Sequence, residues 1–174
     1  MKIQLVMFLW AQLFGAEQVQ TLDREYLEIV SKTKKPIVMG ELNGKKAYFL
    51  LDTGSDITIL NARYQDHYEF KSNMPYYRAV KVTGLGSTEQ SVAYAFKINL
   101  KLGSKGIRTH YYAYDLSKVM ASLERKSGIE IAGIIGSDVM RSYGFQIDYT
   151  KNLVGFMDKK GQNRRTSQLA KAEF

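Results

Sequence analysis

The sequence contains no cysteine, and it has only two prolines and two histidines among its 174 residues. Without cysteine the chain has no disulfide framework, no thiol nucleophile and no cysteine-ligated metal site. His67 and His110 lie far apart and share no spacing typical of metal ligands, so we expect neither a metal nor another cofactor. Two prolines and 14 glycines also leave no room for a long flexible linker between domains.

The chain is basic: 25 Lys and Arg residues against 17 Asp and Glu residues give a formal net charge of +8. A basic chain suggests nucleic acid as a partner. The charges are spread, however, with clusters only at residues 32–35 and 159–171, and no stripe combines basic with aromatic residues as a base-stacking platform does. We therefore do not favour a nucleic-acid partner, and interpret the charge as a solvated surface with a basic tail.

The composition, 45% hydrophobic and 24% charged, is that of one globular domain with a core of its own. At the N-terminus, Lys2 precedes an apolar stretch from Ile3 to Phe14, a length that suits a secretory signal and is short for a membrane span. We predict a signal peptide or an uncleaved anchor over 1–16, with a structural helix as the alternative. The signal would imply export to the periplasm or the extracellular space, with membrane contact only through such an anchor.

The remaining chain divides into a polar connector (17–35), a domain (36–157) and a basic, disordered tail (158–174). Asn43-Gly44 between two apolar runs predicts a hairpin, because it supplies the positive φ angles of a two-residue turn. A second hairpin is predicted around Gly84-Leu85-Gly86. Its later arm alternates apolar with small or polar residues from Val92 to Leu102, which predicts a strand with one buried face.

Two short helices are predicted within this β pattern. One covers 116–126, with Asp115 as its N-cap and Gly128 as its stop, and the other covers 137–143, capped by Ser137. The sum is an all-β domain, a small closed barrel with two short helices.

The stretch "YFLLDTGSDITIL" (48–60) places an aspartate, Asp52, between two apolar strands. Burying an unpaired carboxylate costs free energy, so an aspartate at this position suggests a functional role. Asp, Gly and Ser are also ordinary turn residues, and alone the motif would indicate only a turn. Two further segments change that reading: "VTGLGS" (82–87), which is a glycine-tipped hairpin, and "GIIGSDVM" (133–140).

These three segments, in this order and spacing, resemble the retropepsins, the retroviral-type aspartic proteases, over most of residues 36–156. The resemblance implies the acid-protease barrel and a peptide or protein substrate. It also implies catalysis by two aspartates that share a proton across a homodimer axis, because no second Asp-Thr-Gly or Asp-Ser-Gly occurs in the chain. The chain would thus be an aspartic endopeptidase.

By the same resemblance, Asp52 is the catalytic residue, Thr53 bonds across to its counterpart, Gly54 lets backbone amides approach the carboxylates, and Ser55 donates to Asp52. The substrate cleft would be formed by four groups of residues: Asp56, the flap glycines Gly84 and Gly86, the flap residue Leu85, and Ile134. The alternative for 84–86 is an ordinary surface hairpin.

Two departures stand out. Ser137 occupies the position where the viral enzymes usually have an arginine that supports the dimer interface, and the helix at 116–126 has no counterpart in the compact viral enzymes. The added helix indicates a bacterial or cellular member of the family. The rival hypothesis is a catalytically inactive protease-like module that binds peptides or dimerises.

Overall fold

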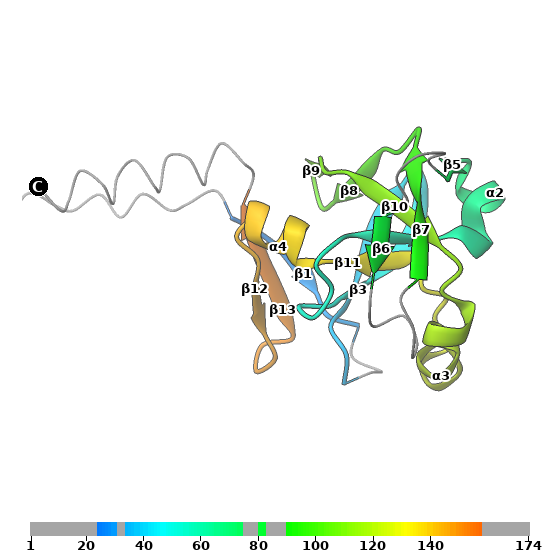
Figure 1. The fold of residues 1–174 in the computed structure, drawn as a ribbon. Coiled ribbons are helices and arrows are strands. Elements are labelled where there is room, and N and C mark those ends of the chain that lie inside the picture. Colours follow the sequence, from blue (N-terminus) through cyan, green and yellow to red (C-terminus); the bar gives the residue numbers. More distant parts are fainter. Residues whose placement is uncertain (1–23, 31–33, 75–79, 83–89, 158–174) are drawn as a thin grey trace, which may run out of the picture.

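The computed structural model describes residues 24–30, 34–74, 80–82 and 90–157. The predicted signal or anchor (1–16), the flap tip (84–86) and the basic tail (158–174) lie outside these residues. The described chain is mostly β, with a few short helices, as predicted (Figure 1). In the described ranges, no helix combines the length and the apolar character that a membrane span requires.

Most strands belong to one ten-stranded sheet. Its members are β2 (Ile37–Leu42), β3 (Lys45–Leu51), β4 (Ile59–Asn61), β5 (Lys71–Asn73), β6 (Val80–Val82), β7 (Gln90–Phe96), β8 (Leu100–Leu102), β9 (Lys105–Ile107), β10 (Tyr111–Tyr114) and β11 (Gly133–Ile135). The order is β5-β7-β10-β4-β11-β3-β2-β8-β9, and β6 pairs with β7. Among the described strands this order is a path whose end strands, β5 and β9, do not pair with each other. Closure of the barrel therefore stays a prediction.

A separate three-stranded sheet has the order β1-β13-β12, with β1 (Arg24–Glu28), β12 (Gln146–Asp148) and β13 (Leu153–Met157). β1 lies within the stretch interpreted from the sequence as a polar connector, and the strand itself was not predicted. The strand forms because Leu27 packs against the core and pairs with Val154, while its polar neighbours face outward. Figure 1 shows this sheet beside α4 on one side of the domain and α3 on the other.

The hairpin between β2 and β3 is confirmed: Asn43 and Gly44 have φ values of 51° and 82°. The single arm predicted from Val92 to Leu102 is instead divided into β7 and β8, because Lys97 has a φ of 58°. The Asn43 side chain holds this break. Its amide donates to the Lys97 carbonyl and its oxygen accepts from the Asn99 amide, at 2.9 and 2.7 Å.

Both predicted helices are present, as α3 (Ser117–Ser127) and α4 (Ser137–Ser142). A 3-10 turn, η1 (Ala62–Tyr64), and α2 (Gln65–Tyr68) were not predicted. The predicted N-caps were wrong, because Leu116 and Gly136 occupy those positions. Asp115 nevertheless accepts from the Ser117 amide at 2.9 Å, and hydrogen bonding from Ser117 lowers the pKa of this carboxyl.

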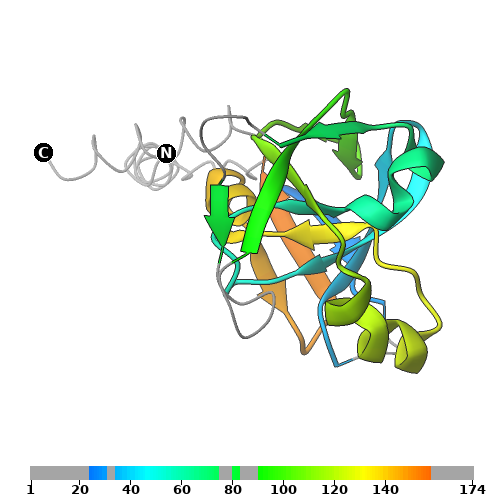
Figure 2. The same ribbon diagram turned by 45° about the vertical axis from the view of Figure 1, so that its right-hand side comes forward.

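The core consists of two clusters on opposite faces of the large sheet. Figures 1 and 2 show the strands of this sheet from two directions. Successive residues of β3 alternate between them: Phe49 and Leu51 enter the first cluster, whereas Leu50 enters the second. A strand with both faces buried reads as a continuous apolar run, as β3 does. Helix α3 adds Met120 to the second cluster and so covers that face.

Candidate active site

The geometry of the site follows from one strand, β11, which lies between β3 and β4. It runs parallel to β3, pairing Ile135 with Leu51, and antiparallel to β4, pairing Ile134 with Ile59. The loop from Asp52 to Thr58 connects β3 to β4 and therefore must pass the end of β11. Residues 52–58 and 135–138 meet there although about 80 positions separate them.

Two glycines allow β11 and the residue after it to lie close to the loop and to β4. A Cβ atom added to Gly136 would lie 2.4 Å from the Ile57 carbonyl oxygen, and one added to Gly133 would lie 2.6 Å from the Ile59 carbonyl oxygen. Real Cβ atoms do not come that close to backbone, so neither position has room for a side chain. The Gly-Ile-Ile-Gly sequence is thus required by the close approach of β11 to the loop and to β4.

Backbone hydrogen bonds fasten the loop at its first residue and at its middle. The Asp52 amide donates to the Ile135 carbonyl at 3.1 Å, and the Ser137 amide donates to the Ser55 carbonyl at 2.7 Å. Within the loop, the Gly54 amide donates to Asp52 Oδ1 at 3.0 Å, and a Cβ on Gly54 would lie 3.3 Å from the same oxygen. The carboxylate is therefore oriented by a backbone amide, in the approach that the sequence predicted for Gly54.

Ser55 does not make the predicted bond to Asp52. Its Oγ donates to the Ile57 carbonyl at 2.8 Å, and its amide donates to the Asp52 carbonyl at 3.2 Å. The hydroxyl is used to close the turn because residues 55–57 bend back toward β4. Ser55 therefore shapes the loop within this chain.

A second polar network lies beneath the loop, and the sequence analysis missed it. Thr58, fully buried, accepts from the Gly136 amide at 3.0 Å and donates to Asp138 Oδ1 at 2.8 Å. The other oxygen, Asp138 Oδ2, accepts from Thr109 Oγ1 at 3.0 Å. The sequence signal was Thr58 itself, a hydroxyl between apolar neighbours just before β4, which must find a partner when buried.

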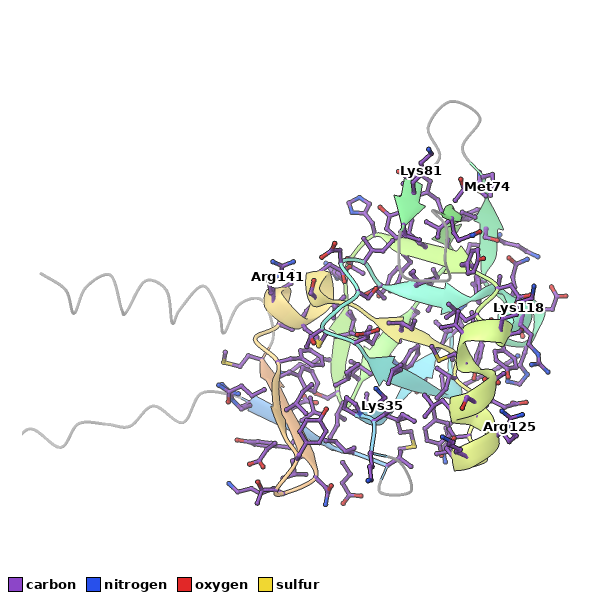
Figure 3. The ribbon with its side chains drawn as sticks, turned by 60° about the horizontal axis from the view of Figure 1, so that its bottom comes forward. Lys35, Met74, Lys81, Lys118, Arg125 and Arg141 are labelled. Atoms are coloured by element: carbon purple, nitrogen blue, oxygen red, sulfur yellow. The ribbon has the colours of Figure 1, made fainter. Side chains whose placement is uncertain are left out.

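The loop presents its tip to solvent. Thr53, Gly54 and Asp56 are exposed, and Asp52 is half-buried. Thr53 and Asp56 also line an open hollow of about 630 Å³, together with Arg141 of α4. Figure 3 labels Arg141 on this helix. The Arg141 guanidinium donates to Ser137 Oγ at 3.0 Å, so a guanidinium stands one helical turn beyond the position at which viral enzymes have their arginine.

Ile134 does not form a cleft wall in this chain. It is 3% exposed and belongs to the second core cluster, because β11 is a central strand with both faces covered. The predicted flap residues Gly84, Leu85 and Gly86 lie outside the described residues. Among the residues that the structure describes, no three His, Cys, Asp or Glu side chains gather as metal ligands would.

Comparisons with known proteins bear on this geometry. The sequence matches the family described as "Aspartyl protease" over residues 38–139, more than half of the chain, and this range contains both the Asp52 loop and β11. A search of curated proteins gave no significant match.

Solved structures with a similar fold include a retropepsin-like aspartic protease from Rickettsia conorii (TM-score 0.48, 16% identity), with 76% of this chain and 89% of that chain covered. The EIAV protease in complex with the inhibitor HBY-793 is also similar (TM-score 0.39, 20% identity), with 62% and 86% covered. The family match over 38–139 confirms the resemblance drawn from the sequence motifs, and the chain belongs to the aspartyl protease family.

Proposed function

We propose that the protein is an aspartic endopeptidase that acts as a homodimer, in which Asp52 of each copy contributes one carboxylate. The observation that carries this proposal is a single Asp-Thr-Gly motif on an exposed loop whose carboxylate is already oriented by the Gly54 amide. An isologous interface brings the same residue to the two-fold axis from both copies. One motif per chain then suffices for a two-carboxylate site.

The chemistry needs both carboxylates. At about 3 Å separation they cannot both ionise, so the pair holds one proton between them. The ionised member takes a proton from a water molecule, whose oxygen forms a bond to the carbonyl carbon of the peptide. The protonated member gives its proton to the carbonyl oxygen, and a later proton transfer to the amide nitrogen accompanies cleavage of the C–N bond.

Within each copy, the residues around Asp52 hold the loop in place. The Asp52 amide is bound to β11 and the Ser55 carbonyl is bound to the start of α4, so the loop is held by two different elements. Rigid support of a reacting group is what makes its encounter with substrate effective. Thr53, exposed beside Asp52, is available to the second copy in the role that the family resemblance implies.

The test compares cleavage of an unfolded protein by the wild type, Asp52→Asn and the control Asp66→Asn, between acid and neutral pH. Asp66 is an exposed aspartate on α2, so its replacement makes the same chemical change away from the loop. We expect Asp52→Asn to lose at least about 100-fold in rate and Asp66→Asn to be unaffected. Equal cleavage by Asp52→Asn would refute the proposal.

The mass in solution gives the second measurement. A dimer with cleavage activity supports the proposal, whereas an active, stable monomer contradicts it. A dimer that binds peptides but never cleaves them would favour the non-catalytic module instead.

A further inference from the structure

A groove separates helix α3 from the segment that precedes β2, and its volume is about 620 Å³. We call it the α3 groove. Its apolar lining consists of Leu50, Val119, Met120 and Leu123. Leu50 and Met120 are buried and form the floor, whereas Val119 is 37% exposed and offers apolar surface to solvent. A concave apolar site of this size is typical of ligand and peptide binding.

The rim of the α3 groove is positive. Lys34, Lys35 and Lys126 line it, and no lining residue carries a carboxylate. Figure 3 labels Lys35, together with Lys118 and Arg125, which add positive charge along α3. Cations around an apolar floor favour a partner with carboxylates beside apolar side chains.

The carboxylate of α3 itself is engaged on another side of the helix. Glu124 Oε1 accepts from the Tyr64 hydroxyl at 3.4 Å and from the Ile131 amide at 2.9 Å. Glu124 is therefore not among the groove residues. Val119 and Leu123 are one turn apart and so share a face of the helix, toward the groove.

One lining residue of the α3 groove, Leu50, belongs to β3 and precedes the candidate catalytic residue by two positions. Asp52 itself begins the loop that follows the strand. Two residues of extended chain span about 7 Å, so a peptide held at the Asp52 loop has only a short distance to the α3 groove.

We propose that the α3 groove binds an extended peptide segment of the protein substrate in which acidic and apolar side chains alternate. Apolar side chains would contact Val119 and Leu123, and carboxylates would meet the lysine rim. The concave shape favours a peptide over a flat lipid surface, because only a chain can enter a groove between two elements. The assignment to a substrate rests on the proposed protease function, whereas peptide binding itself does not.

The first experiment measures binding without cleavage, with the full chain carrying Asp52→Asn. The probes are a fluorescein-labelled peptide of alternating leucine and glutamate, and the same peptide with glutamine in place of glutamate. We expect the glutamate peptide to bind at least about tenfold more tightly, by fluorescence anisotropy. Its affinity should fall as the ionic strength rises from about 0.05 to about 0.5 M, since the lysines are near the surface.

Charge reversal locates the site. Lys34→Glu/Lys35→Glu/Lys126→Glu should weaken binding of the glutamate peptide at least about tenfold. The control with the same net change in charge reverses exposed lysines outside the groove: Lys46→Glu/Lys71→Glu/Lys151→Glu. This control variant should bind the glutamate peptide almost as tightly as the chain that carries Asp52→Asn alone. Equal losses in the two triple variants, or equal affinity for the two peptides, would overturn the proposal.

Val119→Gln tests the apolar part, because this exposed helix residue can change without disturbing the core. It should weaken binding of the glutamate peptide by about threefold or more, with an unchanged circular dichroism spectrum. Co-sedimentation with phosphatidylglycerol vesicles examines the lipid alternative. Vesicle binding that the lysine reversal abolishes, in a chain that ignores both peptides, would contradict the proposal.

The second experiment uses the wild type and two substrates with one cleavable segment, with and without the acidic segment appended. The acidic substrate should have a lower KM, with kcat similar, and the lysine reversal should remove this difference. Cleavage without any preference refutes the groove proposal and leaves the protease function intact. Conversely, peptide binding in a chain that cleaves neither substrate refutes the protease function alone.

Discussion

Thr58 and Asp138, 80 positions apart, join the candidate catalytic loop to helix α4 through a 2.8 Å hydrogen bond from Thr58 Oγ1 to Asp138 Oδ1. The same hydroxyl accepts from the Gly136 amide. One buried side chain thus connects the loop, the end of β11 and the first turn of α4. Its position beneath the loop makes it a support for Asp52 even though it is not in contact with substrate.

Thr58→Val should reduce the free energy of unfolding by about 1–3 kcal/mol, because it leaves the Gly136 amide and an Asp138 oxygen without their partner. The shape of the side chain is nearly retained. Urea denaturation gives the measurement, and Thr109→Val is the control, since Thr109 makes one bond to Asp138 from a half-buried position. Equal urea concentrations at the unfolding midpoints of the two variants would contradict the conclusion that Thr58 supports the loop.

Gly136→Ala should destabilise the protein by about 1–3 kcal/mol or more, since the added Cβ would lie 2.4 Å from the Ile57 carbonyl oxygen. The obstacle is backbone and cannot rotate away. Gly106→Ala is the matched control, because a Cβ at Gly106 has no neighbour within 4 Å. The measurement is the midpoint temperature of thermal unfolding of the two variants. A Gly136→Ala variant as stable as Gly106→Ala would refute the close approach of residue 136 to the Ile57 carbonyl.

Mixing wild-type and Asp52→Asn copies separates a shared site from independent ones. If both carboxylates are needed, an equal mixture at fixed total concentration should retain about a quarter of the wild-type rate, because random pairing leaves that share of intact dimers. If each copy worked independently, the mixture would retain about half of the wild-type rate. The measurement is peptide hydrolysis after the mixture has exchanged subunits, and size-exclusion chromatography verifies that the variant still pairs.

Tyr64 provides a prediction at alkaline pH. Burial and the neighbouring Glu124 raise the pKa of its hydroxyl to about 12 from 10.0. A raised folded-state pKa stabilises the protein below pH 10, and this contribution is lost as the pH rises through 12. Absorbance at 295 nm should show a late-titrating tyrosine that Tyr64→Phe removes and that Glu124→Gln shifts to lower pH. A titration curve unchanged by Tyr64→Phe would refute the assignment.

Short-range signals in the sequence predicted what they control directly. Asn43-Gly44 specifies its own backbone angles, so the hairpin between β2 and β3 was readable. Helix α3 followed from apolar spacing and the stop at Gly128, and α4 followed from Ser137 at its start and Gly144 at its end. The Gly54 amide donates to Asp52 from two positions away. Each of these features depends on neighbours along the chain.

Features that depend on distant partners could not be read. The break after β7 exists because the Asn43 side chain reaches Lys97 and Asn99, more than 50 positions away. β1 resembles a polar connector in the sequence because two of its five residues are exposed and none is buried. Its pairing with β13 defines it as a strand. Ile134 was assigned to the cleft because the family motif ends there, whereas β11 has neighbours on both edges.

The insertion of β11 between β3 and β4 has a consequence for biosynthesis. During translation the loop at Asp52 emerges early, but the segment that fixes its first residue and its middle follows roughly eighty residues later. Contacts between such distant segments form late in folding, because a long loop must close first. A nascent chain that ends before residue 133 therefore lacks the contacts that hold the loop, and the candidate catalytic loop is fixed only when the domain is almost complete.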